Sequence, residues 1–79
     1  MFEYTIANFP DKELFFEQCE ALEENVPGLE KDKQVTDVDG TLIRLYSLNG
    51  KKLTIFNATD FGIYINSEFD INPYFKANN

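Results

Sequence analysis

The chain has 79 residues with 14 acidic and 7 basic side chains, a net charge of −7, one cysteine and no histidine. This length predicts one small domain over residues 1–79, since no linker rich in Pro, Gly or Ser divides it. Without histidine, zinc sites and His-dependent catalysis are excluded, and we expect no metal and no cofactor. The acidic total argues against double-stranded nucleic acid as a partner and favours a basic one.

The chain also lacks the signals of export and membrane insertion. One cysteine cannot form an internal disulfide, and uninterrupted apolar stretches are two or three residues long, against the ~20 needed to span a bilayer. The N-terminus has no basic start followed by an apolar run. We therefore predict a cytoplasmic protein without membrane contact.

The N-terminal third predicts a strand followed by a helix. Residues 2–7 alternate large apolar with small or polar side chains, the period of a half-buried strand. Pro10 and Asp11 then favour a helix start, and the segment 26–28, Val-Pro-Gly, favours its end. The helix between them places Phe15, Cys19, Leu22 and Val26 on one stripe. Cys19 is expected to be a small core residue, because burial and nearby glutamates both raise the pKa of a thiol.

The opposite helix face is acidic, with one carboxylate per turn. Like charges four residues apart cost a helix a few tenths of a kcal/mol per pair. An ordinary solvated face is one interpretation, and a docking surface for a basic protein is the other. The glutamates are Glu13, Glu17, Glu20 and Glu24.

The remaining chain predicts four strands, over residues 33–38, 41–48, 51–57 and 61–66. They are separated by Asp39-Gly40, Asn49-Gly50 and the segment 57–60, all strong turn signals. The tail, 67–79, contains enough apolar residues that we expect most of it to dock on the sheet. The predicted fold is α+β: an N-terminal strand, one amphipathic helix packed on the sheet, and a four-stranded antiparallel meander, in the order β-α-β-β-β-β.

The turn at Asn49-Gly50 allows two registers. A two-residue turn pairs Tyr46 with Leu53 and places Arg44 in an apolar face, whereas a three-residue turn pairs Ile43 with Ile55 and Leu45 with Leu53. We prefer the three-residue turn because it gives an aliphatic core face. By the same logic a three-residue turn ending at Gly40 pairs Val35 with Ile43, so that both side chains face the core. The two turns are expected to have the same structure.

In the preferred register the other sheet face displays aromatic and cationic side chains. Three arrangements can account for such a face: cover by the tail, an interface with a partner or a second copy, or a platform for single-stranded nucleic acid or an aromatic small ligand. The residues expected there are Leu42, Arg44, Tyr46, Lys52, Phe56 and Tyr64.

The segment Asp37-Val38-Asp39-Gly40-Thr41-Leu42 resembles the nucleophile loop of the haloacid dehalogenase-like phosphatases. The resemblance implies Asp37 as nucleophile, Asp39 as acid/base and Thr41 as a phosphate ligand. That family places its loop after a buried parallel strand, but residues 31–36 are mostly charged or polar. We therefore interpret the segment as a turn and predict no enzymatic activity.

These observations favour a small acidic, non-enzymatic protein-binding module of the inhibitor, immunity-protein or adaptor type. The alternative is a binder of single-stranded nucleic acid or of an aromatic small ligand on the aromatic sheet face. A homodimer through the sheet face is also open. The residues expected to contact a protein partner are Glu13, Glu17, Glu20, Glu24, Arg44, Tyr46, Phe56 and Tyr64.

Overall fold

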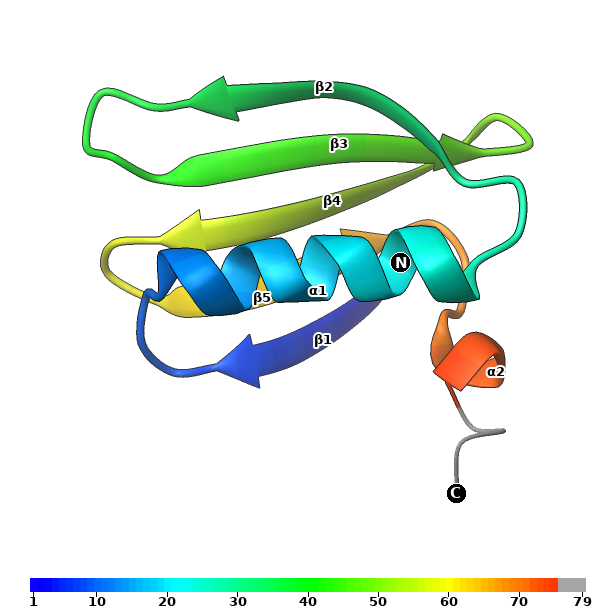
Figure 1. Ribbon diagram of the computed structural model, residues 1–79, viewed down its shortest axis with the longest axis horizontal. Coiled ribbons are helices and arrows are strands. Elements are labelled where there is room, and N and C mark those ends of the chain that lie inside the picture. The colour runs from blue at the N-terminus through cyan, green and yellow to red at the C-terminus, as the bar shows by residue number, and fades with distance from the viewer. Residues whose placement is uncertain (76–79) are drawn as a thin grey trace.

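The computed structural model describes residues 1–75 and confirms the α+β fold (Figure 1). Five antiparallel strands form one sheet in the order β1-β5-β4-β3-β2, and helix α1 lies across one of its faces. The strands are β1 (Phe2–Ala7), β2 (Glu30–Thr36), β3 (Leu42–Leu48), β4 (Lys51–Ala58) and β5 (Gly62–Ser67). The helices are α1 (Lys12–Asn25) and the short α2 (Asn72–Phe75). Within the described residues, no helix has the length and apolar character needed to cross a bilayer.

Helix α1 begins and ends where the sequence predicts. The Asp11 carboxylate caps it by accepting a hydrogen bond from the Leu14 N–H at 3.1 Å. Its C-terminal end is closed by the Val26 N–H, which donates to the Leu22 carbonyl at 3.0 Å. The predicted stripe of Phe15, Cys19, Leu22 and Val26 is almost fully buried, which confirms its role in the core.

The sheet contributes the other half of the core through alternate residues of β4 and β5. Leu53, Ile55, Ile63 and Ile65 are each at most 1 % exposed and face α1. The same face of β3 carries Leu42 and Tyr46. Because Tyr46 pairs directly with Leu53, the register expected for β3 and β4 was wrong.

The turn between β3 and β4 has two residues, not three. Leu48 pairs with Lys51, and both Asn49 (φ 52°) and Gly50 (φ 84°) have positive φ. Asn and Gly tolerate this conformation, and a two-residue turn of this hand matches the twist of the strands. The turn before β3 does have three residues, and its pairing of Val35 with Ile43 is confirmed. The two turns therefore have different structures.

Strand β2 begins earlier than expected, at Glu30 rather than residue 33, and ends at Thr36. It forms an edge of the sheet, and all seven of its residues are exposed. An edge strand open to water on both faces has no apolar alternation to reveal it in the sequence. Its lysines and the irregular pairing between Lys31 and Lys33 are features that discourage pairing with another chain.

The tail as far as Phe75 packs on the side of the sheet that α1 covers. Ile71 is 5 % exposed and belongs to the core, and its N–H donates to the Tyr4 hydroxyl at 3.1 Å. That hydroxyl in turn donates to the Asp70 carboxylate at 2.7 Å. Residues 76–79, which the expected docked tail included, lie outside the described residues.

Candidate protein-binding surface

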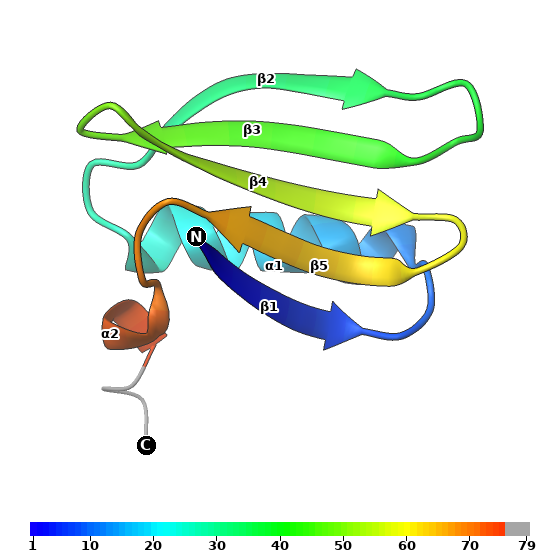
Figure 2. The ribbon, with the colours of Figure 1, turned by 180° about the vertical axis from the view of Figure 1, so that it is seen from behind.

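The sheet face opposite α1 is crossed by no other described element, as Figure 2 shows. We call this side of the sheet the open face. Residues paired across neighbouring antiparallel strands lie on the same face. The pairs Val35–Ile43, Ile43–Phe56 and Phe56–Tyr64 therefore form one row across four strands of the open face. We call these four residues the apolar row.

The apolar row is reinforced by contacts between its own side chains. The rings of Phe56 and Tyr64 stack with centroids 4.5 Å apart and planes 14° from parallel. Leu45 lies next to the row, since it pairs with Lys33 on one side and Thr54 on the other. These side chains remain partly exposed, so the open face presents apolar and aromatic surface to water.

Phe61 extends this surface at the turn between β4 and β5. It is 73 % exposed, and its N–H donates to the Ala58 carbonyl at 3.3 Å. Its ring and that of Tyr64 line two shallow hollows, one of about 370 Å³ toward β1 and one of about 220 Å³ toward β3. A large apolar side chain left this exposed has no role in packing the core.

The smaller hollow, which we call the acidic hollow, has a carboxylate rim. Asp37 and Asp39 come from the turn before β3, and Asp60 comes from the turn before β5. The Asp39 carboxylate accepts hydrogen bonds from the Thr41 N–H at 2.9 Å and the Thr59 hydroxyl at 3.4 Å. The bond from Thr41 is the main cause that lowers the pKa of Asp39. Within residues 1–75 these carboxylates neither form an ion pair nor gather into a group that could hold a metal ion.

The segment that resembles the phosphatase loop lies within this turn. The Asp37 N–H donates to the Thr41 carbonyl at 2.9 Å, and the Asp37 carboxylate accepts from the Val38 N–H at 2.7 Å. Strands β2 and β3, which flank the turn, are antiparallel. The aspartates therefore close a hairpin, whereas the phosphatase family places them after a parallel strand.

The expected site residues fall on separate surfaces. Phe56 and Tyr64 lie together on the open face, as the sequence predicts. Arg44 and Tyr46 pair with Ile55 and Leu53, so they lie on the opposite face, and their expected place beside the two rings was wrong. Leu42 is also on that opposite face, whereas Lys52 remains on the open one. The four glutamates Glu13, Glu17, Glu20 and Glu24 are exposed on α1, on the far side of the molecule from the open face.

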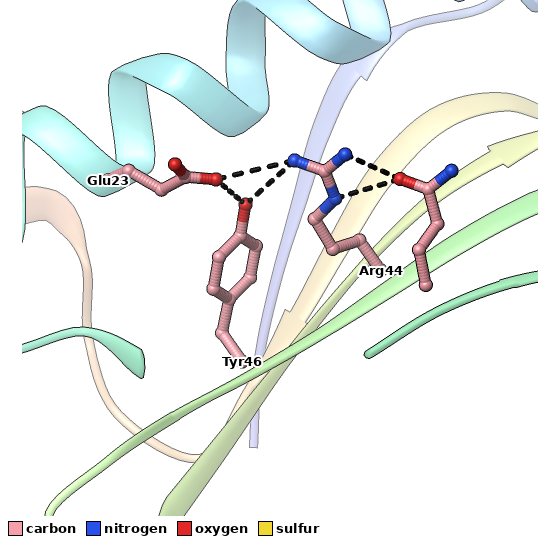
Figure 3. Close-up of polar contacts among 4 residues, drawn as sticks. Glu23, Arg44 and Tyr46 are labelled. Carbon is pink, nitrogen blue, oxygen red and sulfur yellow. Dashed lines mark hydrogen bonds and ion pairs between the residues drawn. The ribbon is translucent and has the colours of Figure 1, made fainter. Parts of the chain in front are cut away.

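Arg44 is held on the core side by partners from the helix and from β2 (Figure 3). Its guanidinium donates to the Glu23 carboxylate at 3.3 Å and to the Gln34 side-chain carbonyl at 2.9 Å. It also lies over the Phe16 ring, 5.5 Å from the centroid. The buried Tyr46 donates its hydroxyl to the same Glu23 carboxylate. This cluster joins α1 to β3 and accounts for an arginine at the border of an apolar face.

Cys19 belongs to the same core cluster as Tyr46 and is fully buried. Burial raises the pKa of its thiol, which keeps the sulfur protonated and poorly nucleophilic near neutral pH. The expectation that it is a small core residue is confirmed.

Sequence reasoning missed several residues of the open face. Ile43 and Leu45 were assigned to the core because the register of β3 was shifted by one. Val35 was expected to face the core together with Ile43, which was also wrong, since it is 40 % exposed on the open face. None of three further residues was assigned to a binding surface: Asp37 was considered as a phosphatase-type nucleophile or a turn residue, Asp60 as part of a turn, and Phe61 as the start of a strand. The Asn49-Gly50 pair was the available signal, since it is the strongest short-range indication of a two-residue turn.

Comparisons of the chain with protein-family models, with curated proteins and with solved structures gave no match. No function can therefore be transferred to this chain from a relative. Its function has to be argued from the chemistry of its own surfaces.

Proposed function

We propose that this protein is a small non-enzymatic interaction module that docks a partner protein on its open face. The observation that carries the proposal is the one-sided packing of the sheet. Helix α1 and the described tail both cover the same face, and the apolar row and Phe61 have no cover among residues 1–75. Contiguous exposed apolar surface with a polar rim is typical of protein interaction sites.

The partner we propose is a basic protein that contributes apolar side chains to the contact. The chain carries a net charge of −7, and the acidic hollow borders the apolar row. A negative field of this kind attracts a basic partner and raises its rate of association. A second copy of this chain is disfavoured, because the two copies would repel each other. The buried single cysteine supports our proposal of a reducing compartment such as the cytoplasm.

The alternative, binding of single-stranded nucleic acid or an aromatic small ligand, ranks second. The stacked pair of Phe56 and Tyr64 favours it, because bases and aromatic ligands stack on such rings. Of the two cations expected beside the rings, Arg44 lies on the other face and is paired with Glu23, whereas Lys52 remains on the open face. Phosphate groups placed near Phe61 would meet the carboxylates of the acidic hollow.

The test compares two exposed phenylalanines on opposite faces. Phe61→Ser alters the open face, and Phe2→Ser is the matched control, since Phe2 is 42 % exposed and pairs with Ser67 on the core side. Proteins captured from the host by wild-type protein are purified and titrated against both variants by calorimetry. We expect Phe61→Ser to weaken binding about tenfold or more, as for a hot-spot aromatic, and Phe2→Ser to leave it unchanged.

Two results would contradict the proposal. One is a partner that binds both variants as tightly as the wild type, which would place its contact elsewhere. The other is the absence of any direct partner together with a monomer in sedimentation at micromolar concentration. A stable dimer that Phe61→Ser dissociates would instead identify a second copy as the occupant.

A further inference from the structure

The two ends of the open face differ in charge. Beyond one side of the apolar row, where β2 and β4 end, lie Asp37, Asp39 and Asp60. The other side is mixed in charge, because two lysines lie there among carboxylates. Lys33 pairs with Leu45 and Lys52 pairs with Ser47. The carboxylate residues at this end are Glu30, which also pairs with Ser47, Glu3, which pairs with Asn66, and Asp32, whose carboxylate accepts from the Ser47 hydroxyl at 3.3 Å. A partner with an uneven distribution of charge therefore meets this face in one preferred orientation.

The acidic hollow has the chemistry of a site for one cationic side chain. Its walls include the rings of Phe56, Phe61 and Tyr64, and its rim carries the aspartates. Cations are attracted to aromatic faces, and the aliphatic stem of a lysine or arginine packs well on apolar walls. The volume of about 220 Å³ is small, which suits a single side chain better than a folded element.

The carboxylates that face this hollow have no cation to neutralise them in the described chain. Asp60 makes no hydrogen bond or ion pair with any residue from 1 to 75, and the ion pair of Arg44 with Glu23 lies on the other face. Asp39 is held by Thr41 and Thr59, and the lowered pKa keeps it ionised at neutral pH. Charge complementarity at this end therefore calls for a positive group from outside.

We infer that docking is directional: the partner covers the apolar row with apolar side chains and inserts one lysine or arginine side chain beside Phe61 into the acidic hollow. This inference rests on the proposed function, since it specifies the chemistry of the same partner. A second copy turned end for end would bring Lys33 and Lys52 toward the aspartates. The carboxylates of Glu3, Glu30 and Asp32 share that end with the lysines and would oppose such a contact. With −7 on each chain, the second copy is the weaker occupant.

The test uses three capped tripeptides, Phe-Arg-Phe, Phe-Gln-Phe and Phe-Glu-Phe, titrated into the ¹⁵N-labelled protein. Amide shifts report both affinity and location. We expect the arginine peptide to bind at least about fivefold more tightly than the glutamate peptide, from one exposed cation–π contact and one exposed charge pair. The shifts should concentrate in residues 37–41 and 58–64, the two segments that border the hollow.

Two charge reversals then separate the hollow from the overall field. Asp60→Lys changes the rim, and Glu24→Lys makes the same change on the exposed face of α1. Asp60 has no structural bond to lose in the described chain, so both variants should fold, which is checked by their thermal unfolding. Asp60→Lys should weaken the arginine peptide about three- to tenfold and leave the glutamine peptide nearly unchanged, while Glu24→Lys should change neither by more than about twofold.

The outcomes distinguish the inference from the proposed function. Equal binding of all three peptides on the open face would overturn the directional inference and leave the docking proposal standing. Shifts of the arginine peptide confined to the helix glutamates would overturn the inference and relocate the contact. An equal loss in Asp60→Lys and Glu24→Lys would show a general field effect and also overturn the inference. If no peptide shifts any open-face amide, both the inference and the proposed function fail.

Discussion

Gly62 controls how closely β1 approaches the turn that carries Phe61. A side-chain carbon added at this glycine would lie 2.3 Å from the Ala7 carbonyl oxygen, 2.6 Å from the Phe9 nitrogen and 2.8 Å from the Asn8 carbonyl carbon. All three are backbone atoms, which cannot move aside as a flexible side chain would. Gly62 also has φ 99°, a conformation that residues with a side chain rarely adopt. Gly62→Ala therefore combines a steric clash with backbone atoms and an unfavourable backbone conformation.

Gly50→Ala provides the matched control, because it has the unfavourable backbone conformation without the steric clash. Gly50 has φ 84°, and an added carbon there has no atom within 4 Å. A positive φ costs a residue with a side chain about 1–2 kcal/mol, which sets the expected loss for Gly50→Ala. For Gly62→Ala we expect about 3–5 kcal/mol, since the backbone of residues 7–9 must also shift by roughly 1 Å and weaken the pairing of Ala7 with Ile63.

Urea unfolding followed by circular dichroism measures both losses. A domain of this length has a total stability of about 4–12 kcal/mol, so Gly62→Ala should remove a large fraction of it. Amide exchange should show β1 losing protection before β3 and β4. Equal destabilisation by the two substitutions would refute the reasoning, because it would mean that the close approach of β1 costs nothing beyond the backbone conformation.

Three further predictions concern titratable groups. Because the pKa of Asp39 is lowered, its contribution to stability is present above its ordinary pKa of 3.8 and is lost as the pH falls below that value. In Asp39→Asn the unfolding temperature should therefore change less with pH between about pH 5 and 3 than in the wild type. Burial raises the pKa of Tyr46 above its ordinary value of 10.0, so its contribution to stability is present below pH 10 and is lost as the pH rises further. In Tyr46→Phe the free energy of unfolding should therefore fall less steeply with pH above 10. At neutral pH this variant should lose about 1 kcal/mol of stability, because the hydrogen bond of the hydroxyl is gone. Cys19 should react with a thiol reagent only as fast as the protein opens, and a reaction at the rate of a free thiol in the folded state would contradict its burial.

Two of the four residues of the apolar row, Phe56 and Tyr64, could be placed from the alternation within their own strands. Phe56 and Tyr64 each lie between core residues of their own strands, Ile55 before Phe56 and Ile65 after Tyr64, so alternation alone sends both rings to the other face. Ile43 and Leu45 were not predictable in this way. Every residue from Leu42 to Tyr46 except Arg44 is apolar, so alternation does not decide which set faces the core.

Arg44 is the residue that misled the sequence-based choice of register. Considered alone, an arginine on a core face is costly, because a buried charge requires a partner. The partners come from distant parts of the chain: Glu23 from α1, Gln34 from β2 and the ring of Phe16. Once α1 lies across the sheet, the Arg44 guanidinium reaches its partners at the border of the helix. The register with a two-residue turn therefore gives the charge its partners and still buries the apolar residues of the core.

The sequence by itself determined the elements whose signal is local: the extent of α1, its buried stripe, the faces of β4 and β5 and the turn character of the phosphatase-like segment. Only the tertiary structure decided the face of β3, the assignment of β2 as an edge and the side of the sheet on which the tail lies as far as Phe75. The physical reason is that periodicity reports the neighbours of a residue along its own element. The open face depends instead on which distant segments pack together. Contacts that no local pattern contains hold these segments in place: Tyr4 with Asp70 and Ile71, and Glu23 with Tyr46.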